Sequence, residues 1–153
     1  MIQTLKRLMT IREVHAHCDI PCGIYDPIAA KIAAQTVLKM VVRIEALDDG
    51  DMSNEAGNSF FRYVAVKEEH AELCKREINI LSNDYFKPEH HDAHADLHSA
   101  IGNATKLASA NKQGVDKEAA ENLVAAVDEI ATIFWATKGV EYNDPVASVR
   151  FGT

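Results

Sequence analysis

Apolar residues recur along most of the chain at intervals of three and four, the spacing that places side chains on one face of an α-helix. Four segments carry this pattern, and short runs rich in Asp, Gly, Asn and Pro separate them. No segment shows the strict alternation of apolar and polar residues that is typical of a half-buried β-strand. The pattern predicts an all-α protein, an antiparallel four-helix bundle with helices of roughly 20 residues joined by short loops.

The first two predicted helices have recognisable ends. The first opens at Asp26-Pro27, an N-cap acid followed by a proline at the first helical position, and ends at Asp48-Asp49-Gly50. The second runs from about Glu55 to Ser82, with Lys67 as the one interruption of its apolar stripe. The residues expected to face the core are Ile28, Ile32, Val37, Val41 and Ile44 in the first helix, and Phe60, Val64, Ala71, Cys74, Ile78 and Leu81 in the second.

The other two helices occupy the second half of the chain. The third is predicted to begin after Pro88 and to end near Ala110, before a loop at Asn111–Gly114. The fourth is predicted from about Asp116 to Lys138, with Gly139 as a helix stop. The residues expected to face inward are Leu97, Ile101, Ala104 and Ala108 in the third helix, and Ala120, Leu123, Val127, Ile130 and Phe134 in the fourth.

The composition narrows the class of protein. The chain has 153 residues, 47% of them apolar and 25% charged, which suits one globular domain with a hydrophobic core. No apolar run approaches the ~20 residues of a membrane span, so we expect no membrane association. The formal net charge of −7 argues against a nucleic-acid partner, because nucleic-acid binding needs a broad basic surface.

The first sixteen residues differ in charge from the rest. Lys6, Arg7 and Arg12 against Glu13 make Met1–Ala16 basic, and the remainder of the chain carries a net charge of −9. The longest apolar stretches in this segment are two residues, whereas a secretory signal needs an apolar core of about 7–15. We therefore interpret Met1–Ala16 as a propeptide or flexible arm. An anionic substrate would need a local positive patch to approach the acidic remainder.

Three cysteines, Cys18, Cys22 and Cys74, are too few for a disulfide scaffold, and an odd number fits poorly with a fully paired secreted protein. We therefore expect reduced thiols and a cytoplasmic location. Cys74 falls on the apolar stripe of the second predicted helix, where a buried, hydrophobe-like cysteine is expected.

The unusual chemistry lies in the turn-rich segment His17-Cys18-Asp19-Ile20-Pro21-Cys22. A turn through Pro21 can bring Cys22 back toward His17 and Cys18, and thiolate with imidazole suits a soft or borderline transition metal. The Cys-x-x-x-Cys spacing differs from the Cys-x-x-Cys of thioredoxins and zinc knuckles. On spacing alone, a metal-binding hook and a pair of surface thiols that sometimes oxidise are both open.

A second group of possible ligands lies at the start of the third predicted helix. His90, His94 and His98 are spaced so that one helix would carry them on a single face, and His91 adds a fourth ring. They predict either a second metal site or, as we favour, a polar and partly solvated face.

The run HCDIPCGIYDP, which starts at His17, resembles the nickel hook of nickel-containing superoxide dismutases, whose mature form starts at the histidine. Two further stretches resemble the same family. One is Asn83–Pro88 with His90 and Leu97-His98 after it, and the other is Ile133–Lys138. Together the three stretches extend over nearly all of the chain after Ala16.

The resemblance implies an enzyme that converts superoxide to oxygen and hydrogen peroxide with one nickel ion per subunit. The implied metal ligands are the α-amine and imidazole of His17, the amide nitrogen and thiolate of Cys18, and the thiolate of Cys22. The α-amine exists only after a maturation peptidase cuts between Ala16 and His17. The implied organisation is a propeptide at 1–16 and an enzyme domain at 17–153, with the hook at 17–25 and the bundle at 26–139. The family also implies a homo-oligomer, a hexamer.

Four further residues receive catalytic roles from the resemblance. Tyr25 would cover the open face of the metal, Asp19 would shape the hook, and Tyr85 and Lys87 would reach the site from the second stretch. Lys87 would supply positive charge for superoxide. The alternative hypothesis is a non-catalytic metal-binding or thiol helical bundle, which has no need of these residues.

Two positions depart from the family pattern. Ala33 stands where the family often has a glutamate that orients the axial histidine, and His70 stands where it often has an arginine. The hydrogen bonds around the metal ligands are therefore expected to differ here.

Overall fold

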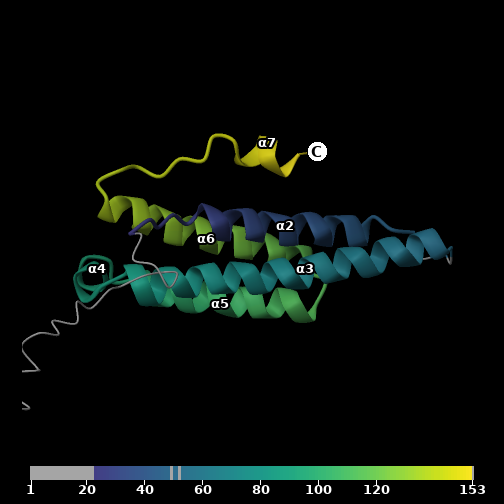
Figure 1. The fold of residues 1–153 in the computed structure, drawn as a ribbon, viewed down its shortest axis with the longest axis horizontal. Helices are drawn as coiled ribbons and strands as arrows, with labels where there is room; N and C mark the ends of the chain where they lie inside the picture. Colours follow the sequence, from purple (N-terminus) through teal and green to yellow (C-terminus); the bar gives the residue numbers. More distant parts are fainter. Residues whose placement is uncertain (1–22, 49, 52, 153) are drawn as a thin grey trace, which may run out of the picture.

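The computed structural model describes residues 23–48, 50–51 and 53–152, and within them seven helical segments and no strand. The segments are α2 (Ile28–Glu45), α3 (Asn54–Ile80), the π-helical turn η1 (Leu81–Tyr85), α4 (Pro88–Ala93), α5 (Leu97–Gln113), α6 (Lys117–Thr137) and α7 (Ala147–Phe151). The long helices α2, α3, α5 and α6 lie side by side along the length of the molecule (Figure 1). The predicted all-α bundle is confirmed.

The core between these helices is built from small and aliphatic side chains. Its α2 face consists largely of alanines, including Ala30, Ala33 and Ala34, with Val37 and Val41 further along the helix. Small residues let helices approach closely, so many dispersion contacts form per unit length. Among the described residues, no helix combines the length and the apolar character that a membrane crossing demands.

Part of the predicted core is wrong. Ile28 and Ile32 are 38% and 45% exposed, because α2 turns its alanines rather than these isoleucines toward the other helices. Phe60 is 41% exposed; it lies near the start of α3, the end of that helix that extends past α5 and α6 (Figure 1). The C-terminal half of the α3 stripe is confirmed, with Cys74 and Ile78 fully buried.

Lys67, the predicted interruption of the stripe, is buried with only 2% of its surface exposed. Its ammonium group donates hydrogen bonds to the main-chain carbonyls of Asn111 and Lys112 in the last turn of α5. These carbonyls have no partner within the helix, and a cation there also complements the negative end of the helix dipole. The buried charge is thus paired with the end of a neighbouring helix.

The third predicted helix is wrong in its continuity, because it is two helices. His94 leaves the helical region with φ −131° and ψ 86°, which ends α4 at Ala93. The chain then turns so that the amide of Leu97 donates to the carbonyl of His94, and α5 starts there with Leu97 fully buried. The loop that follows also begins later than the predicted Asn111–Gly114, because α5 continues to Gln113.

The fourth predicted helix is confirmed within one residue at each end. The side chain of Asp116 accepts a hydrogen bond from the amide of Ala119, a standard N-cap. Gly139, with φ +70°, follows the end of α6 in the left-handed region that favours glycine. This glycine lets the chain reverse direction after α6.

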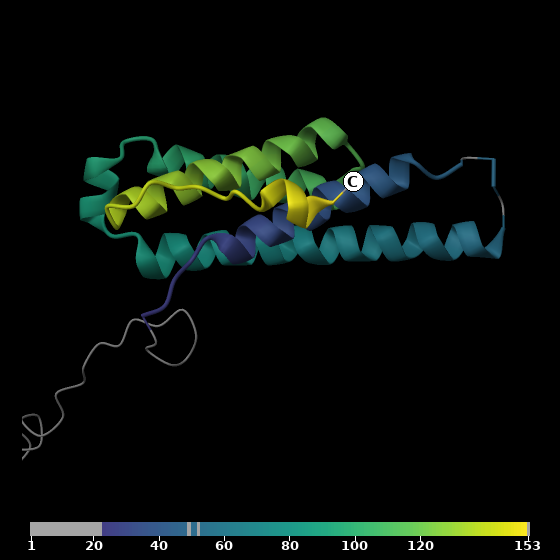
Figure 2. The ribbon, with the colours of Figure 1, turned by 90° about the horizontal axis from the view of Figure 1, so that it is seen from above.

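The chain beyond Gly139 runs back along α6 and α2 and ends in α7 (Figure 2). We call residues 140–152 the C-terminal strap. Gln35 and Lys39, one turn apart on α2, contact it. The Gln35 amide donates to the carbonyl of Ala147 at 3.0 Å, and the Lys39 ammonium lies 4.9 Å over the ring of Phe151.

Two further sets of polar contacts, one around Arg150 and one around Asp128, complete the attachment of the strap. Arg150 donates to both carboxylate oxygens of Asp144, at 2.8 and 2.9 Å, and to Oε1 of Gln35. The hydroxyl of Tyr142 donates to Asp128 of α6, whose other oxygen pairs with the buried Lys31. The strap is therefore bound by polar contacts to both neighbouring helices.

Candidate functional site

The predicted metal ligands His17, Cys18 and Cys22, the predicted Asp19 and the leader Met1–Ala16 lie outside the described residues. The described chain begins at Gly23, whose φ of +66° is one that favours glycine. It continues through Tyr25 and Asp26 to Pro27, which is the N-cap of α2, one residue later than the predicted Asp26. The side chain of Asp26 still accepts a hydrogen bond from the amide of Ile28 at 2.8 Å. We call residues 23–27, which lead into α2, the stem of α2.

Tyr25 meets Tyr85, so the structure brings together two of the predicted site residues from distant parts of the chain. Their ring centroids lie 5.4 Å apart at an interplanar angle of 51°. Phe86 and Phe134 also contact Tyr85, with centroids at 5.2 and 4.5 Å, and His90 lies parallel to it at 5.4 Å. We call these five residues the aromatic cluster. It lies at the end of the bundle where α2 begins and α3 and α6 end (Figure 1).

Tyr85 owes its position to the π-helical turn. The amide of Phe86 donates to the carbonyl of Leu81 at 2.9 Å, one residue further back than in an α-helix. Such a turn adds a residue to the end of α3 and redirects the side chains that follow, and π turns are frequent at functional sites. Leu81 itself is buried in the core, so the turn is anchored on its inner side.

The hydroxyl of Tyr85 is held by Thr137 at the end of α6. The two side-chain oxygens lie 2.6 Å apart, and the Thr137 hydroxyl donates to the carbonyl of Phe134 at 2.6 Å. Since Thr137 has one proton and gives it to that carbonyl, the Tyr85 hydroxyl is the donor to Thr137. The phenol proton of Tyr85 is therefore directed toward α6.

Lys87 is exposed at the N-cap of α4. Its main-chain amide donates to Nδ1 of His90 at 3.1 Å, which fixes the start of α4 and the acceptor nitrogen of that ring. His90 therefore binds the backbone of Lys87 and stacks on Tyr85. The prediction that His90, His94 and His98 share one helix face is wrong, because the break at His94 separates α4 from α5.

Two residues of this end, Thr137 and Lys138, were missed by the sequence interpretation as site residues. His90 was predicted only as part of a possible second metal site or a solvated face. The ammonium of Lys138 lies 5.0 Å from the ring centroid of Tyr85 and 5.1 Å from that of Phe134. The signal was the Ile133–Lys138 stretch, in which Phe134, Thr137 and Lys138 follow the i, i+3, i+4 spacing of one helix face. That spacing predicts that the three side chains share one face of the helix, but it does not predict that this face meets Tyr85.

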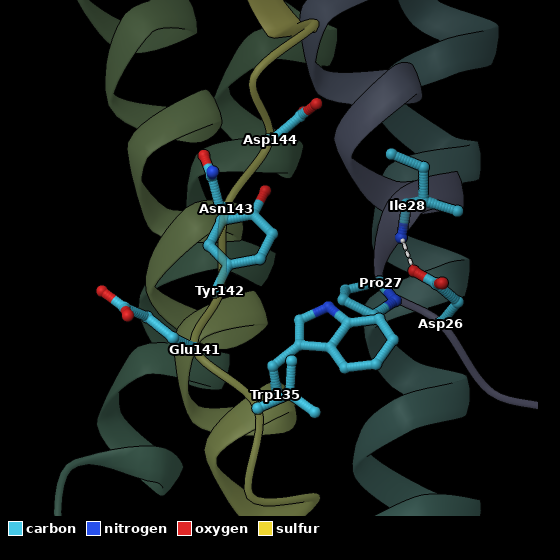
Figure 3. Close-up of a pocket in the computed structure, with 9 residues that line it drawn as sticks. Asp26, Pro27, Ile28, Trp135, Glu141, Tyr142, Asn143 and Asp144 are labelled. Carbon is cyan, nitrogen blue, oxygen red and sulfur yellow. Dashed lines mark hydrogen bonds between the residues drawn. The ribbon is translucent and has the colours of Figure 1, made fainter.

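A separate hollow of about 270 Å³ lies beside the stem of α2, between α6 and the strap. Figure 3 shows the indole of Trp135 next to Pro27, with Tyr142 and Asp144 of the strap beyond them. Asp26 and Glu141 also line it. Asp144 is paired with Arg150, so Asp26 and Glu141 are the carboxylates that make this hollow unfavourable for a small anion. The aromatic cluster, in contrast, has a cation beside it.

Ala33 and His70 occupy the two positions where the chain departs from the family pattern. Ala33 is buried in the core. His70 is half-buried and its Nδ1 lies 2.9 Å from the carbonyl of Val66 in its own helix. A carbonyl can only accept, so Nδ1 carries the proton and Nε2 is left as the acceptor. The ring is thereby held by the turn before it.

Within the described residues, no group of three His, Cys, Asp or Glu side chains is arranged to hold a metal ion. Cys74, the one cysteine among them, is buried, and burial raises the pKa of its thiol to about 12. A thiol in this state is a poor ligand and a poor nucleophile. In the sequence, the segment before Gly23 holds two thiols and an imidazole, donors that suit a soft or borderline transition metal.

The structure shows an all-α bundle with paired tyrosines at the start of α2 and the end of η1. Two thiols and an imidazole precede them in the sequence, and together these features fit the class of small all-α metalloenzymes. The family model of nickel-containing superoxide dismutases matches residues 12–138. The chain belongs to this family. It is an oxidoreductase that dismutates superoxide, and its cofactor is nickel.

Individual relatives agree with this assignment. The chain is 36% identical over 126 residues to the superoxide dismutase [Ni] of Streptomyces seoulensis, which covers 82% of this chain and 91% of the relative. It is 35% identical to that of Streptomyces coelicolor, with 82% and 90% covered. A crystal structure of a Ni-containing superoxide dismutase with nickel ligation corresponding to the oxidised state superposes with a TM-score of 0.72 at 35% identity, covering 81% of this chain and all of the other.

Proposed function

We propose that nickel is bound by the hook 17–25, through the α-amine and imidazole of His17, the amide nitrogen and thiolate of Cys18, and the thiolate of Cys22. The carrying observation is the contact between Tyr25 and Tyr85. Tyr25 follows the second thiol by three residues, so the hook joins the bundle at the aromatic cluster. The ring pair lies where a residue of the hook and a residue of the second family-like stretch would share a substrate path.

We also propose that the active chain starts at His17. Residues 1–16 would be a propeptide, removed by a maturation peptidase that cuts between Ala16 and His17, and 17–153 the enzyme domain with its bundle at 26–139. While Ala16 is attached, the nitrogen of His17 is an amide, a much weaker donor than a free amine. A homo-hexamer and a cytoplasmic location complete the proposal. A reducing compartment keeps the two hook thiols available as ligands.

When bound, nickel would supply one-electron chemistry by alternating between Ni(III) and Ni(II). The overall reaction turns two superoxides and two protons into oxygen and hydrogen peroxide. The residues of the chain would attract the superoxide anion and exclude larger molecules. Tyr25 and Tyr85 present an aromatic wall that narrows access to a small anion. The hydroxyl of Tyr85 donates its hydrogen bond to Thr137, which directs the phenol O–H toward α6. Lys87 adds positive charge at the same end, and Asp19 would order the hook through its carboxylate.

The test combines three measurements on protein expressed with nickel and its maturation peptidase. Intact mass should show loss of Met1–Ala16, metal analysis should give about one nickel per chain, and superoxide consumption should follow nickel content. Cys18→Ser and Cys22→Ser should each abolish nickel binding and activity. Cys74→Ala is the matched control, because it removes a thiol buried among the bundle helices and should keep both.

The alternatives give different results. A non-catalytic metal-binding bundle would hold nickel without consuming superoxide, and a thiol bundle would keep its leader and hold none. Full activity in the Cys18→Ser, Cys22→Ser double variant, or in a chain that still starts at Met1, would falsify the proposed ligand set.

A further inference from the structure

The body of this protein is acidic, and superoxide is an anion. The formal net charge is −7 for the whole chain, and the hollow beside the stem of α2 is lined by three carboxylates. Such a body slows the approach of an anion unless positive charge lies close to the path. The position of the cations at the aromatic cluster therefore determines how fast substrate arrives.

Lys138 is the cation that lies on the tyrosine pair. Its ammonium is 5.0 Å from the ring centroid of Tyr85 and 5.1 Å from that of Phe134, while Tyr25 lies on the same tyrosine at 5.4 Å. Lys138 directly follows Thr137, the last residue of α6, which accepts the hydrogen bond from the Tyr85 hydroxyl. It is exposed, and no ion pair within the described residues neutralises it.

Lys138 and Lys87 reach this end from different elements. Lys87 is placed by the N-cap of α4, with its amide bound to His90. Lys138 is placed by the end of α6 and by the rings beneath it, a contact that favours a cation over the ring face. The rings hold the ammonium of Lys138 in one place, whereas no ring contact of Lys87 fixes its charge among the described residues.

We propose that Lys138 guides superoxide to the path beside Tyr25 and Tyr85, a role that rests on the proposed location of the hook. The charge acts through its field rather than by contact with the reacting atoms. A unit charge about 6 Å from an anion in water changes its local concentration by about three-fold. Added salt screens this attraction over a Debye length of about 10 Å at 0.1 M.

The matched control lies on the same helix. Lys117 is an exposed lysine at the first turn of α6, and Lys138 follows its last turn, a separation of about 30 Å at 1.5 Å per residue. Lys138→Gln and Lys117→Gln therefore make the same change of net charge at opposite ends of one helix. Lys138→Arg keeps the charge and the ring contact.

The first measurement is kcat/KM for superoxide against ionic strength, with nickel content measured for each protein. Lys138→Gln should lower kcat/KM about three-fold at low salt and flatten its decline with salt. Lys138→Arg should keep most of the wild-type kcat/KM and most of its decline with salt. Lys117→Gln should change neither kcat/KM nor this decline. A purely structural role for Lys138 would leave the salt slope unchanged.

The second measurement needs no nickel. Trp135 is the single tryptophan of the chain, lies three residues before Lys138 on α6, and contacts Phe134 with ring centroids at 5.2 Å. In nickel-free protein, iodide should quench its fluorescence less in Lys138→Gln than in the wild type or Lys117→Gln. Neutral acrylamide should quench all three equally, which separates a loss of anion attraction from a change in exposure.

The two possible failures are distinguishable. Wild-type protein that holds nickel and consumes no superoxide would contradict the proposed function. An active wild type with Lys138→Gln indistinguishable from Lys117→Gln in salt slope and in iodide quenching would overturn the role of Lys138 and leave the proposed function intact.

Discussion

The hydroxyl of Tyr85 lies 2.6 Å from Oγ1 of Thr137, so the last residue of η1 is tied to one that follows it by 52 positions at the end of α6. Because the Thr137 hydroxyl donates its hydrogen bond to the carbonyl of Phe134, the Tyr85 hydroxyl is the donor to Thr137. The tyrosine that faces Tyr25 is thus oriented by a helix on the other side of the bundle.

Replacing Thr137 by valine should loosen Tyr85 without removing any ring. The variant loses the acceptor of the phenol proton, and we expect a fall of about 1 kcal/mol in the free energy of unfolding. It should also lower kcat for superoxide, because Tyr85 gains freedom to turn away from Tyr25. Urea unfolding and steady-state kinetics on nickel-loaded protein measure the two effects.

Thr132→Val provides the control for the threonine change. Thr132 is an exposed residue of α6 whose hydroxyl donates to the carbonyl of Asp128 in the preceding turn. If Thr137→Val and Thr132→Val gave the same kcat, the tie to Tyr85 would have no part in the reaction.

Lys67 supplies the prediction on pH. Burial lowers the pKa of its ammonium from the usual value, so between that lowered pKa and the ordinary one of about 10.4 the unfolded chain binds more protons than the folded one. Stability linked to this group therefore rises with pH through that window and is lost as pH falls to the lowered pKa. Urea unfolding between pH 8 and pH 10.5 should show this rise in the wild type.

Two variants separate the charge of Lys67 from its packing. Lys67→Met keeps a long side chain in place, and we expect it to remove the rise with pH. Lys67→Ala leaves a cavity and unpaired carbonyls at the end of α5, which should cost about 3 kcal/mol. An unaltered pH dependence in Lys67→Met would assign the rise to other groups.

The sequence predicted those helix boundaries that local chemistry determines. Asp116 and Gly139 bracket α6, and both act through contacts within a few residues, a side-chain cap and a left-handed turn. The break between α4 and α5 was missed because the residues around His94 are ordinary in a helix. The break depends on how Leu97 enters the core, a constraint from other helices.

The candidate site was predicted as a set of residues and not as an arrangement. Tyr25 and Tyr85 were assigned from their resemblance to family stretches, and their contact was not derivable from spacing along the chain. The π-helical turn that aims Tyr85 differs from an α-helical end by one residue in hydrogen-bond register. The sequence identified Lys138 only as the last residue of the family-like stretch Ile133–Lys138. Its proposed role depends on the rings that lie next to the end of α6, and the spacing along the chain does not predict these.

Cys74 should be chemically silent in the native protein. It is fully buried, and its thiol pKa is raised to about 12, first by burial and then by Glu77. At pH 8 its thiolate fraction is therefore very small, and alkylation requires the thiolate. Brief treatment of nickel-free protein with iodoacetamide, followed by peptide mass spectrometry, should modify Cys18 and Cys22 and leave Cys74 unmodified until denaturant is added. Rapid labelling of Cys74 in native protein would contradict its burial.

The C-terminal strap begins just past the family match, which ends at residue 138, and its stability should depend on one ion pair. Arg150 holds the pKa of Asp144 below its usual value, mainly through their hydrogen bond. A lowered carboxyl pKa means that the unfolded chain binds more protons below about pH 4. The stabilisation is complete above that range and is lost as pH falls through the lowered pKa.

Arg150→Ala should therefore release the strap while the bundle stays folded. The variant removes a two-point contact to Asp144 and a bond to Gln35, and we expect the strap to open more easily by about 1–2 kcal/mol. Hydrogen exchange of residues 140–152 at neutral pH should rise by about ten-fold for 1.4 kcal/mol. Arg76→Ala, which removes an exposed arginine with only a 3.8 Å contact to Glu77, should leave that exchange unchanged. Because the strap is held to α2 and α6 by side chains rather than by the core, amides of α3 should keep their protection in both variants. If α3 lost protection together with the strap, the strap would belong to the cooperative unit of the bundle.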